Sequence, residues 1–435
     1  MNKQELKDRV RTAIRKQANE ITALAEAIAR EPELGFKEHK TAAKIQSFFQ
    51  QRNIPFTTEH AITGVKGTLK GRSSRRNIAV LGEMDAVTCF DHPLANTETG
   101  AAHACGHHAQ IAAMMGCGAG LAASGVMDEL DGDVTLFAVP AEEYVEIEYR
   151  NRLRQEGKIR YLGGKAELIR CGAFDGIDMA MMVHLSTDGD KNRVMGIGGT
   201  SNGFVGKMIH YTGREAHAAG APDKGINALN AAMIGLMAVN AMRETFRDED
   251  YVRFHPIITK GGDLVNVIPA EVRLESYVRG KTVESILDAN FKVNRALRGG
   301  AAAIGAEVEI SDLPGYLPLV NNDRMTELFR RNAVTLLGEN STKPLGHNPG
   351  STDMGDLSHI MPIIHPWVGG VTGVAHTRDF RVCDPEMAYI INAQCMAMTV
   401  IDLLADQAAE ADELLENYQP KMTKKQYLAF MESIK

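Results

Sequence analysis

The sequence predicts an α/β protein with a mostly parallel sheet, into which a smaller α+β domain is inserted. Three apolar runs of strand length, Asn77–Glu83, Val134–Val139 and Met179–Val183, alternate with helical patterns. This alternation is typical of a parallel sheet covered by helices. From about 199 to 313 the order changes to strand, long helix, two extended segments, long helix and strand. That βαββαβ-like order favours a separate α+β domain.

Flexible pairs of residues border the inserted segment. Gly198–Gly199 precede it and Pro314–Gly315 follow it, and both pairs suit a hinge. We therefore expect the larger domain in two parts, at 1–198 and 314–435, with the insertion at 199–313.

The other elements follow from periodicity and from helix-breaking residues. Helical patterns at 4–30 and 38–52 are separated by the turn EPELGFKE, where Pro32 and Gly35 interrupt the pattern. Further helices are expected at about 108–124, 163–171, 225–246, 283–303, 323–337 and 384–406, and further strands at 203–213, 254–260, 271–280 and 306–312. The charged residues 407–435 form either a surface helix or a loosely held tail.

Composition limits the partners and the compartment. The chain has 435 residues, of which 44% are hydrophobic and 24% charged, as in a globular protein of two or three domains. Its net charge of −7 and its lack of a long basic run argue against nucleic acid and anionic membranes as partners. We found neither a signal-peptide pattern nor a stretch approaching a membrane span, so we expect a cytoplasmic protein.

The stretch Gly100–Gln110, GAAHACGHHAQ, contains one cysteine and three histidines. Cys105 and His107 are two residues apart, so their side chains project the same way from an extended backbone. Thiolate and imidazole are suitable ligands for Zn²⁺, Mn²⁺ or Co²⁺. The alternative is a buried thiol beside hydrogen-bonded histidines, and this stretch alone leaves both readings open.

Carboxylates or an imidazole follow each of the three apolar strands. Asp85 comes after the first, Glu142 and Glu143 follow the stop at Pro140, and His184 ends the third. The carboxyl ends of parallel strands meet at one edge of the sheet, where ligand sites form. Such residues can also cap turns. Their expected position at the same edge of the sheet as the cysteine-histidine stretch favours a metal site.

Together these motifs resemble the M20 metallopeptidase and amidohydrolase family, in particular its aminoacylases, aminobenzoyl-glutamate hydrolases and amino-acid-conjugate hydrolases. The matching segments, in the family's order, are EPELGFKEHKT (31–41), LGEMDAV (81–87), HACGH (103–107), PAEE (140–143), MVHL (182–185), GREAHAAGAPDKGINAL (213–229), LVNVIPAEV (264–272) with Arg279, and AHTRDF (375–380). The resemblance implies a zinc-peptidase-like catalytic domain and an inserted ferredoxin-like lid through which such subunits usually form homodimers or higher homo-oligomers.

The resemblance also implies a ligand set for a divalent metal, with one or two ions per subunit. Mn²⁺ and Zn²⁺ are the leading metals, and Co²⁺ is a further option. The implied ligands are Cys105, His107, Glu143, His184 and His376. The cysteine would bind as thiolate and the histidines as neutral imidazoles, so metal affinity should fall at acid pH.

Five further residues match positions that act on the substrate or orient a ligand. Glu142 matches the general base, and Asp85 matches an acid that orients a ligand histidine. His217 matches an oxyanion donor that commonly serves the neighbouring subunit's site. Asn266 and Arg279 match residues that hold the substrate's carboxylate. Asp85 could instead cap a turn, His217 could lie on a domain surface, and Arg279 could form a surface ion pair.

The chain departs from the family's pattern at two places. The aminoacylase-like motif continues as CGHDxH, and here His108 and Gln110 stand at the places of the aspartate and the last histidine. His108 could ligate metal, contact substrate or face solvent; we favour the last two and count it among the substrate-binding candidates. His103 is expected to support the site or to be structural. The segment Tyr144–Tyr161 is longer than the usual link and forms a surface helix or lines the substrate entrance.

The implied activity is metal-assisted hydrolysis of a C–N amide bond, with Glu142 as general base. The expected substrate is a small N-acyl or aryl-amide conjugate of an amino acid that carries a carboxylate. The alternatives are a dipeptidase, an aminohydrolase that releases an amine from an aromatic ring, and a non-catalytic protein that binds a small molecule.

Overall fold

A computed structural model describes residues 2–186 and 193–434. The chain divides into two compact units. The large unit comprises Met1–Thr200, Val320–Gly346 and Asp356–Lys424, and the small unit comprises Ser201–Leu319, His347–Gly355 and Lys425–Lys435. The small unit thus includes three segments, 314–319, 347–355 and 425–435, that the sequence pattern assigns to the second part of the larger domain. The domain borders at 198/199 and 313/314 stay a prediction.

The large unit contains a six-stranded, mostly parallel sheet. Its strands, in spatial order, are β1 (Phe56–His60), β2 (Gly64–Leu69), β6 (Asp133–Val139), β3 (Asn77–Glu83), β7 (Met179–Met181) and β18 (Ile363–Ile364). The strands from β6 to β18 run parallel, whereas β1 and β2 add an antiparallel edge. All of β6 and nearly all of β3 are buried, which explains their unbroken apolar runs. The predicted α/β class is confirmed.

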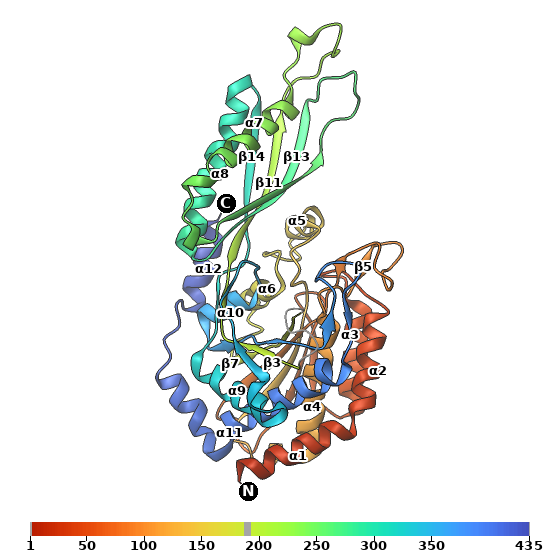
Figure 1. Ribbon diagram of the computed structural model, residues 1–435, viewed down its shortest axis with the longest axis vertical. Helices are drawn as coiled ribbons and strands as arrows, with labels where there is room; N and C mark the ends of the chain where they lie inside the picture. Colours follow the sequence, from red (N-terminus) through yellow and green to blue (C-terminus); the bar gives the residue numbers. More distant parts are fainter. Residues whose placement is uncertain (1, 187–192, 435) are drawn as a thin grey trace. The chain divides into compact units, whose positions relative to one another are not determined.

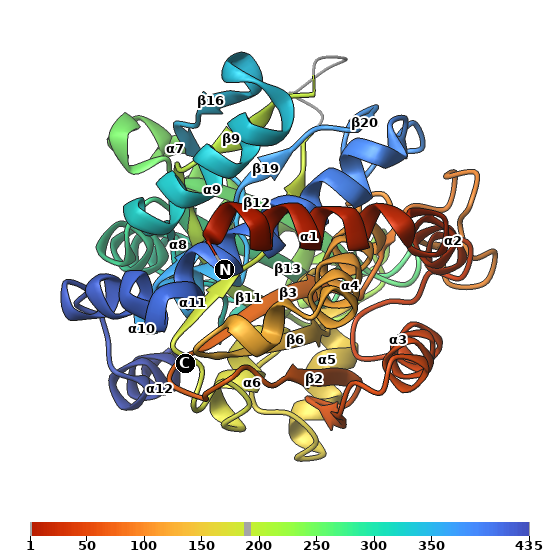
Figure 2. The same cartoon turned by 90° about the horizontal axis from the view of Figure 1, so that it is seen from below.

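Four helices form much of the core beside this sheet. They are α1 (Lys3–Lys16), α2 (Ala18–Ala29), α4 (His107–Ser124) and α11 (Asn392–Glu416). Figure 2 shows α1, α4 and α11 close together, in agreement with their many mutual contacts. The close fit of α4 on the sheet needs small residues, since a Cβ at Gly118 would lie 2.2 Å from Leu136 Cδ1.

The chain also forms other helices and many short strands. The helices are α3 (His39–Gln51), α5 (Ile147–Gln155), α6 (Gly164–Arg170), α9 (Asp323–Leu337) and α10 (Met354–Ile360). The strands are β4 (Val87–Thr88), β5 (Ala101–Ala102), β8 (His184–Leu185), β9 (Met195–Ile197), β10 (Thr200–Ser201), β15 (Leu319–Val320), β16 (Thr342–Pro344), β17 (His347–Asn348), β19 (Trp367–Val368), β20 (Val371–Thr372) and β21 (Arg381–Val382).

Two long helices differ from the sequence expectation. The pattern at 4–30 forms two helices, because the chain leaves helical geometry at Gln17, whose side chain donates to Ala119 O at 3.2 Å. The expected helix at 384–406 begins as a π-helix, Glu386–Ile391, and α11 then continues to Glu416 with a kink near Ala405. By length and composition the helical stretch Glu386–Glu416 could cross a membrane, but its apolar window is entirely buried, as in a core helix.

The small unit has a four-stranded antiparallel sheet and two long helices. The strands are β11 (Gly203–Thr212), β12 (Arg253–Lys260), β13 (Glu271–Gly280) and β14 (Glu307–Pro314), and the helices are α7 (Ala228–Ala241) and α8 (Val283–Ile304). The spatial order β12-β13-β11-β14 with helices after β11 and β13 is that of a ferredoxin-like unit. Both helices lie along one face of the sheet (Figure 1).

The C-terminal segment is packed, not loose. Its last helix is α12 (Lys424–Ser433), in which Tyr427 and Met431 are buried. Met431 lines the same small apolar pocket as Phe204 and Ile286 of the small unit.

Candidate metal centre

The candidate site lies at the carboxyl edge of the parallel strands in the large unit. Asp85 lies two residues beyond β3, Glu142 and Glu143 follow the end of β6, and His184 begins β8 shortly after β7. The cysteine-histidine stretch reaches the same edge, because α4 begins at His107. The sheet therefore brings together groups that are far apart in the sequence.

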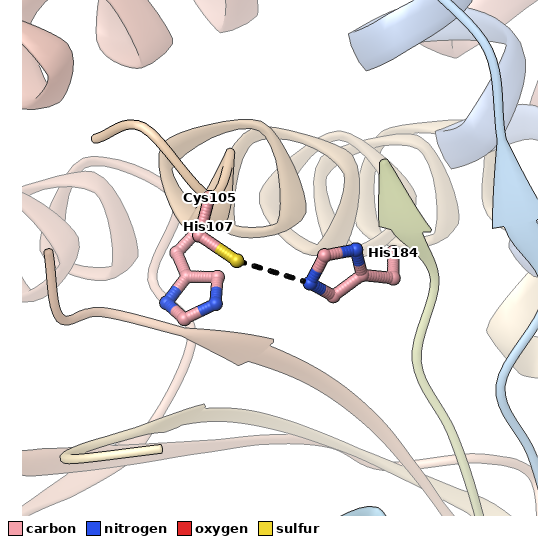
Figure 3. Close-up of side chains that lie close together, drawn as sticks. All are labelled: Cys105, His107 and His184. Carbon is pink, nitrogen blue, oxygen red and sulfur yellow. Dashed lines mark hydrogen bonds between the residues drawn. The ribbon is translucent and has the colours of Figure 1, made fainter. Parts of the chain in front are cut away.

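A glycine sets the direction of this stretch. Gly106 has a φ of 93°, and a Cβ there would lie 2.8 Å from Leu185 Cδ1, so both the conformation and the space require glycine. Cys105 precedes this turn and His107 follows it. Figure 3 shows the Cys105 thiol directed at His184, whose Nε2 is 3.4 Å from Sγ.

The five predicted ligands form two overlapping groups. One group contains Cys105, His107 and His184, and the other contains Cys105, Glu143 and His376; within each, the donor atoms lie within 4.8 Å of one another. Glu143 Oε1 is 3.1 Å from His376 Nε2. The amide of His376 donates to Ala104 O at 2.9 Å, which fixes its loop to the cysteine-histidine stretch. The Cys105 thiol is the donor that both groups share.

These residues fit a divalent transition metal. Thiolate, imidazole and carboxylate are the donors that Zn²⁺ and related ions take. His107 Nε2 is buried and makes no hydrogen bond of good geometry among the described residues, although Glu83 Oε2 lies 3.1 Å from it. Burial opposes ionisation of Cys105, but the imidazoles of His184 and His107 lower the pKa of its thiol to about 6. The cysteine is thus prepared to act as a thiolate.

Glu143 and His376 form a charged pair. Burial would raise the pKa of Glu143, but the His376 imidazole lowers it to about 2. The Glu143 carboxylate in turn raises the pKa of His376 to about 11. A metal that used both groups would have to displace this proton, so acid should weaken its binding.

Asp85 contacts the residues of two predicted ligands. His107 Nδ1 lies 2.8 Å from Asp85 O and 3.3 Å from Oδ1, and Oδ2 accepts the Glu143 amide hydrogen at 2.9 Å. These contacts occupy Nδ1, so Nε2 is the His107 nitrogen that could bind a metal.

The predicted base, Glu142, follows a strained turn. Ala141 has a φ of 55°, which is uncommon for a residue other than glycine. Its amide donates to Glu38 Oε1 at 2.8 Å, and its carbonyl accepts from Arg150 Nη1 at 3.3 Å. Glu142 is 7% exposed, with Oε2 3.9 Å from His107 Nε2. The turn therefore holds this carboxylate beside the ligand cluster.

Sequence reasoning did not single out a buried ion pair behind His107. Glu83 Oε1 accepts from Lys165 Nζ at 2.6 Å, and Glu83 Oε2 accepts from Gln110 Nε2 at 2.8 Å. His107 Nε2 is 3.1 Å from Glu83 Oε2. Burial would raise the pKa of Glu83, but Lys165 and His107 lower it to about 2. Gln110, which departs from the family pattern, thus hydrogen-bonds a carboxylate next to the site.

His108 lies away from the ligand cluster. It is 5% exposed, so the solvent-facing alternative is wrong. Its ring centroid is 5.3 Å from that of His103 and 6.2 Å from that of Tyr389. Burial lowers the pKa of His108 to about 3. Its place among the substrate-binding residues stays a prediction.

His217 and Asn266 lie on adjoining segments of the small unit. His217 forms a β-bridge with Val267, and the amide that follows His217 donates to Asn266 O at 2.9 Å. His217 Nδ1 accepts from the amide of Gly220 at 2.9 Å. The proton of a neutral imidazole must then be on Nε2, which makes His217 a hydrogen-bond donor at an exposed position.

Arg279 ends β13 and is held by side chains that the sequence did not suggest. Nη1 donates to Ser351 Oγ at 2.7 Å, and Nε donates to His255 Nε2 at 3.1 Å. The guanidinium lies 5.3 Å from the ring centroids of Phe204 and Tyr277. Ser351 lies between β17 and α10.

The donor cluster and the adjacent carboxylate define a hydrolase that uses a metal. Residues 79–400 match peptidase family M20/M25/M40, and because this match covers most of the chain, the protein belongs to that family. It is therefore an enzyme of a metallo-hydrolase family, as the sequence motifs predict.

Individual relatives are distant but similar in length. The chain is 26% identical to a Xaa-Arg dipeptidase of Mus musculus, over 92% of this chain and 89% of that protein. It is 25% identical to an N-acyl-L-amino acid amidohydrolase of Geobacillus stearothermophilus, over 79% and 88%.

Solved structures show the same fold. A putative aminohydrolase from methicillin-resistant Staphylococcus aureus matches with a TM-score of 0.73 and 21% identity, over 91% of this chain and 99% of that one. A Bacillus subtilis protein described as a dinuclear metal-binding peptidase of the M20 family matches with a TM-score of 0.66 and 22% identity, over 90% and 99%.

Proposed function

We propose that this protein is a metal-dependent amidohydrolase that cleaves the C–N amide bond of an N-acyl or aryl-amide conjugate of an amino acid. The observation that carries the proposal is the position of Glu142, a buried carboxylate 3.9 Å from His107 Nε2. Glu142 is outside the two ligand groups that share Cys105, and with Glu83 and His107 it forms a third group of possible metal ligands. A carboxylate at this place can move protons while other groups hold the metal.

Several relatives support this substrate class. Besides the Geobacillus amidohydrolase, the chain is 26% identical to an N-acetylcysteine deacetylase of Bacillus subtilis and 25% identical to a hippurate hydrolase of Campylobacter jejuni. Each of these names describes a protein that acts on an N-acyl amino acid. The reaction that they share is hydrolysis of an amide between an acyl group and an amino acid.

In the proposed mechanism Glu142 acts twice. It first accepts a proton from the water that attacks the amide carbon, and it then donates this proton to the nitrogen as the C–N bond breaks. When bound, a divalent metal supplies a Lewis acid that lowers the pKa of water and polarises the carbonyl. Asp85 keeps His107 oriented throughout, and the Ala141 turn keeps Glu142 close to this cluster.

His217 is proposed to stabilise the oxyanion, and the protein is proposed to act as a homodimer. Its Nε2 hydrogen, exposed on the small unit, is a suitable donor for a developing negative charge. If the partner subunit supplies this donor, mixed dimers of Glu142→Gln and His217→Ala subunits should regain part of the activity. Confirmed mixed dimers without activity would place the whole site in one subunit.

Asn266 and Arg279 are proposed to hold the substrate's carboxylate. The Arg279 guanidinium is already oriented by Ser351 and by two aromatic rings, so less entropy is lost when it binds a carboxylate. Arg279→Ala should raise KM for substrates with a carboxylate and leave KM for uncharged amides nearly unchanged. An equal rise for both classes would exclude this role.

The metal is proposed to be Mn²⁺ or Zn²⁺, with Co²⁺ as a further option, and two ions per subunit are proposed. Each of the two overlapping groups supplies three donor atoms, and the Cys105 thiol belongs to both groups. This arrangement supports the proposal of two ions. The similar Bacillus structure is described as dinuclear, which supports the same number. We propose a cytoplasmic location, on the composition alone.

A dipeptidase is the second candidate, because Xaa-Arg dipeptidases are among the relatives that match nearly the whole chain. The third candidate is an aminohydrolase that releases an amine from an aromatic ring, because this reaction uses the same proton transfers. The metal-loaded enzyme should be assayed with N-acetyl amino acids, hippurate, Xaa-Arg dipeptides and aromatic amines. Highest kcat/KM on the acylated amino acids supports the proposal, highest kcat/KM on dipeptides or aromatic amines replaces it, and binding without turnover of any compound would indicate a non-catalytic protein.

A further inference from the structure

A cavity of about 220 Å³ in the large unit lies beside the cysteine-histidine stretch. Its walls come from α2, the loop that contains His92, the first turn of α4 and the segment 380–389. Among the residues that line it, none is one of the five predicted metal ligands. His107 and His108 are adjacent in the sequence, but only His108 lines this cavity.

Two buried histidines lack hydrogen bonds at this cavity. His103 is 4% exposed and His108 is 5% exposed, and both line the cavity. Both ring nitrogens of His103 and Nδ1 of His108 are buried without a partner among the described residues. Buried polar groups are nearly always paired, because an unpaired one keeps the full cost of leaving water. Water or another molecule from outside the chain can satisfy these nitrogens.

The walls indicate that this occupant is uncharged. The charged residues that line the cavity, Glu26, Arg30 and Arg381, are all exposed and so lie at its rim. Glu26 and Arg30 pair with each other at 3.1 Å. The deeper walls include Phe380 and Tyr389, and transfer of an ion between such rings costs far more than transfer of a neutral molecule. A metal ion would find two neutral imidazoles and no inner carboxylate.

The cavity has rigid walls. His92 is fixed on both sides, since Nδ1 accepts the Leu94 amide hydrogen at 3.1 Å and Nε2 lies 3.0 Å from Phe380 O. Tyr389 belongs to the π-helix Glu386–Ile391, a rare geometry that is frequent at functional sites. These features distinguish a formed site from a packing gap.

We propose that this cavity binds a small, uncharged aromatic molecule that carries both a hydrogen-bond donor and an acceptor, as a primary aryl amide does. Two neutral imidazoles supply two N–H donors and two nitrogen acceptors, which complement both atoms of an amide. Phe380 and Tyr389 provide the aromatic contact. The volume of about 220 Å³ is below the ~300–1,000 Å³ of pockets for drug-sized ligands, so it suits a single ring.

The test uses benzamide as the probe and the metal-loaded full-length protein. Saturation-transfer NMR and the ¹⁵N resonances of the histidine rings should report saturable binding with a dissociation constant in the millimolar range, as expected for a ligand of this size. Benzoate should bind at least tenfold more weakly, because its charge is not compensated inside. The affinity should stay unchanged when acetohydroxamate, a metal-binding compound, saturates the catalytic metal.

Two variants alter the cavity from different walls. His108→Leu removes one imidazole, and Ala29→Phe fills the space from α2 while both histidines are retained. Each should weaken benzamide binding at least tenfold, while His39→Leu, an exposed histidine on α3, should leave it unchanged. Should His108→Leu fail to fold, Ala29→Phe still decides the question.

Four results would overturn the proposal. Absence of saturable benzamide binding would mean that water alone fills the cavity. Displacement of benzamide by acetohydroxamate would mean that the compound binds at the metal centre. Equal or tighter binding of benzoate would show that the rim arginines select a charged ligand. Unchanged affinity in Ala29→Phe would place the binding site elsewhere.

Discussion

The guanidinium of Arg150 donates a hydrogen bond to the carbonyl oxygen of Ala141, and both residues are completely buried. Arg150 also donates to Leu162 O at 2.8 Å. It belongs to α5, within the segment 144–161 that is longer than the usual link in this family. This segment therefore reaches inward to the turn that carries Glu142.

Replacement of Arg150 by methionine should destabilise the protein and reduce activity. The change removes the donor to Leu162 O and one of the two donors to Ala141 O, which keeps the Gly164 amide at 3.0 Å. Loss of the partner of a buried carbonyl costs about 1–3 kcal/mol of the free energy of unfolding. The change also loosens the Ala141 turn, so kcat should fall more than KM rises. Urea unfolding and steady-state kinetics measure both effects. Arg152→Met, on the exposed side of the same helix, is the control, and equal behaviour of the two variants would contradict this role for Arg150.

Removal of Lys165 should be among the most destabilising single changes in the large unit. Lys165 and Glu83 are both fully buried, so Lys165→Met leaves a carboxylate without its cation at a cost of about 3–5 kcal/mol. The double variant Lys165→Met/Glu83→Gln should recover part of that loss in chemical unfolding. Lys158→Met, which breaks an exposed ion pair with Glu156, should have no measurable effect. No recovery in the double variant would argue against the uncompensated charge as the cause.

Stability should fall as the pH rises from about 4.5 to about 7, because of Glu38. Burial, with the Asp85 charge adding to it, raises the pKa of Glu38 to about 7 from an ordinary value of 4.5. The folded state thus binds this proton more tightly than the unfolded state, and the stabilisation present below pH 4.5 is lost as the carboxyl ionises. Glu38→Gln keeps an acceptor for the Ala141 amide and should flatten this part of the profile of unfolding free energy against pH. An unchanged slope would mean that other groups cause it.

The two overlapping ligand groups predict different metal losses in two variants. Cys105→Ser should lower the occupancy of both ions, because the thiol belongs to both groups. His376→Ala should remove one ion only, because His376 belongs to one group. Elemental analysis after gel filtration counts the ions, and the wild type should hold two per subunit. Loss of activity with a chelator should be reversed by Mn²⁺, Zn²⁺ or Co²⁺, and a single ion in the wild type would contradict the shared-thiol arrangement.

The sequence was sufficient for three neighbouring strands of the six-stranded sheet and for the groups at their carboxyl edge. The three apolar runs form β6, β3 and β7, because strands buried on both faces need unbroken apolar residues. Parallel strands present their carboxyl ends at one edge of the sheet, so the polar groups that follow these strands lie at that edge. The family motifs predict five metal ligands, and the structure places their donor atoms in two overlapping groups.

Other features depend on contacts between distant segments and could not be predicted from local patterns. Lys165 and Glu83 are separated by 82 positions, and a lysine on a short helix shows no sign of complete burial. Arg150 lies on a polar helix whose inward side is set by packing. For His108 only the solvent-facing alternative is wrong, and contact with substrate stays a prediction. The direction of a residue in the first turn of a helix is fixed by its neighbours, here His103 and Tyr389, which local patterns do not identify.

The central claim is that Glu142 transfers the protons while the cysteine-histidine-carboxylate cluster holds the metal. The measurement is the metal content and the kcat of Glu142→Gln on an N-acyl amino acid that the wild type hydrolyses. We predict an unchanged metal content and a kcat lower by about 10²–10⁴, the usual contribution of a positioned acid or base. A kcat close to that of the wild type in a fully metal-loaded variant would contradict the assignment.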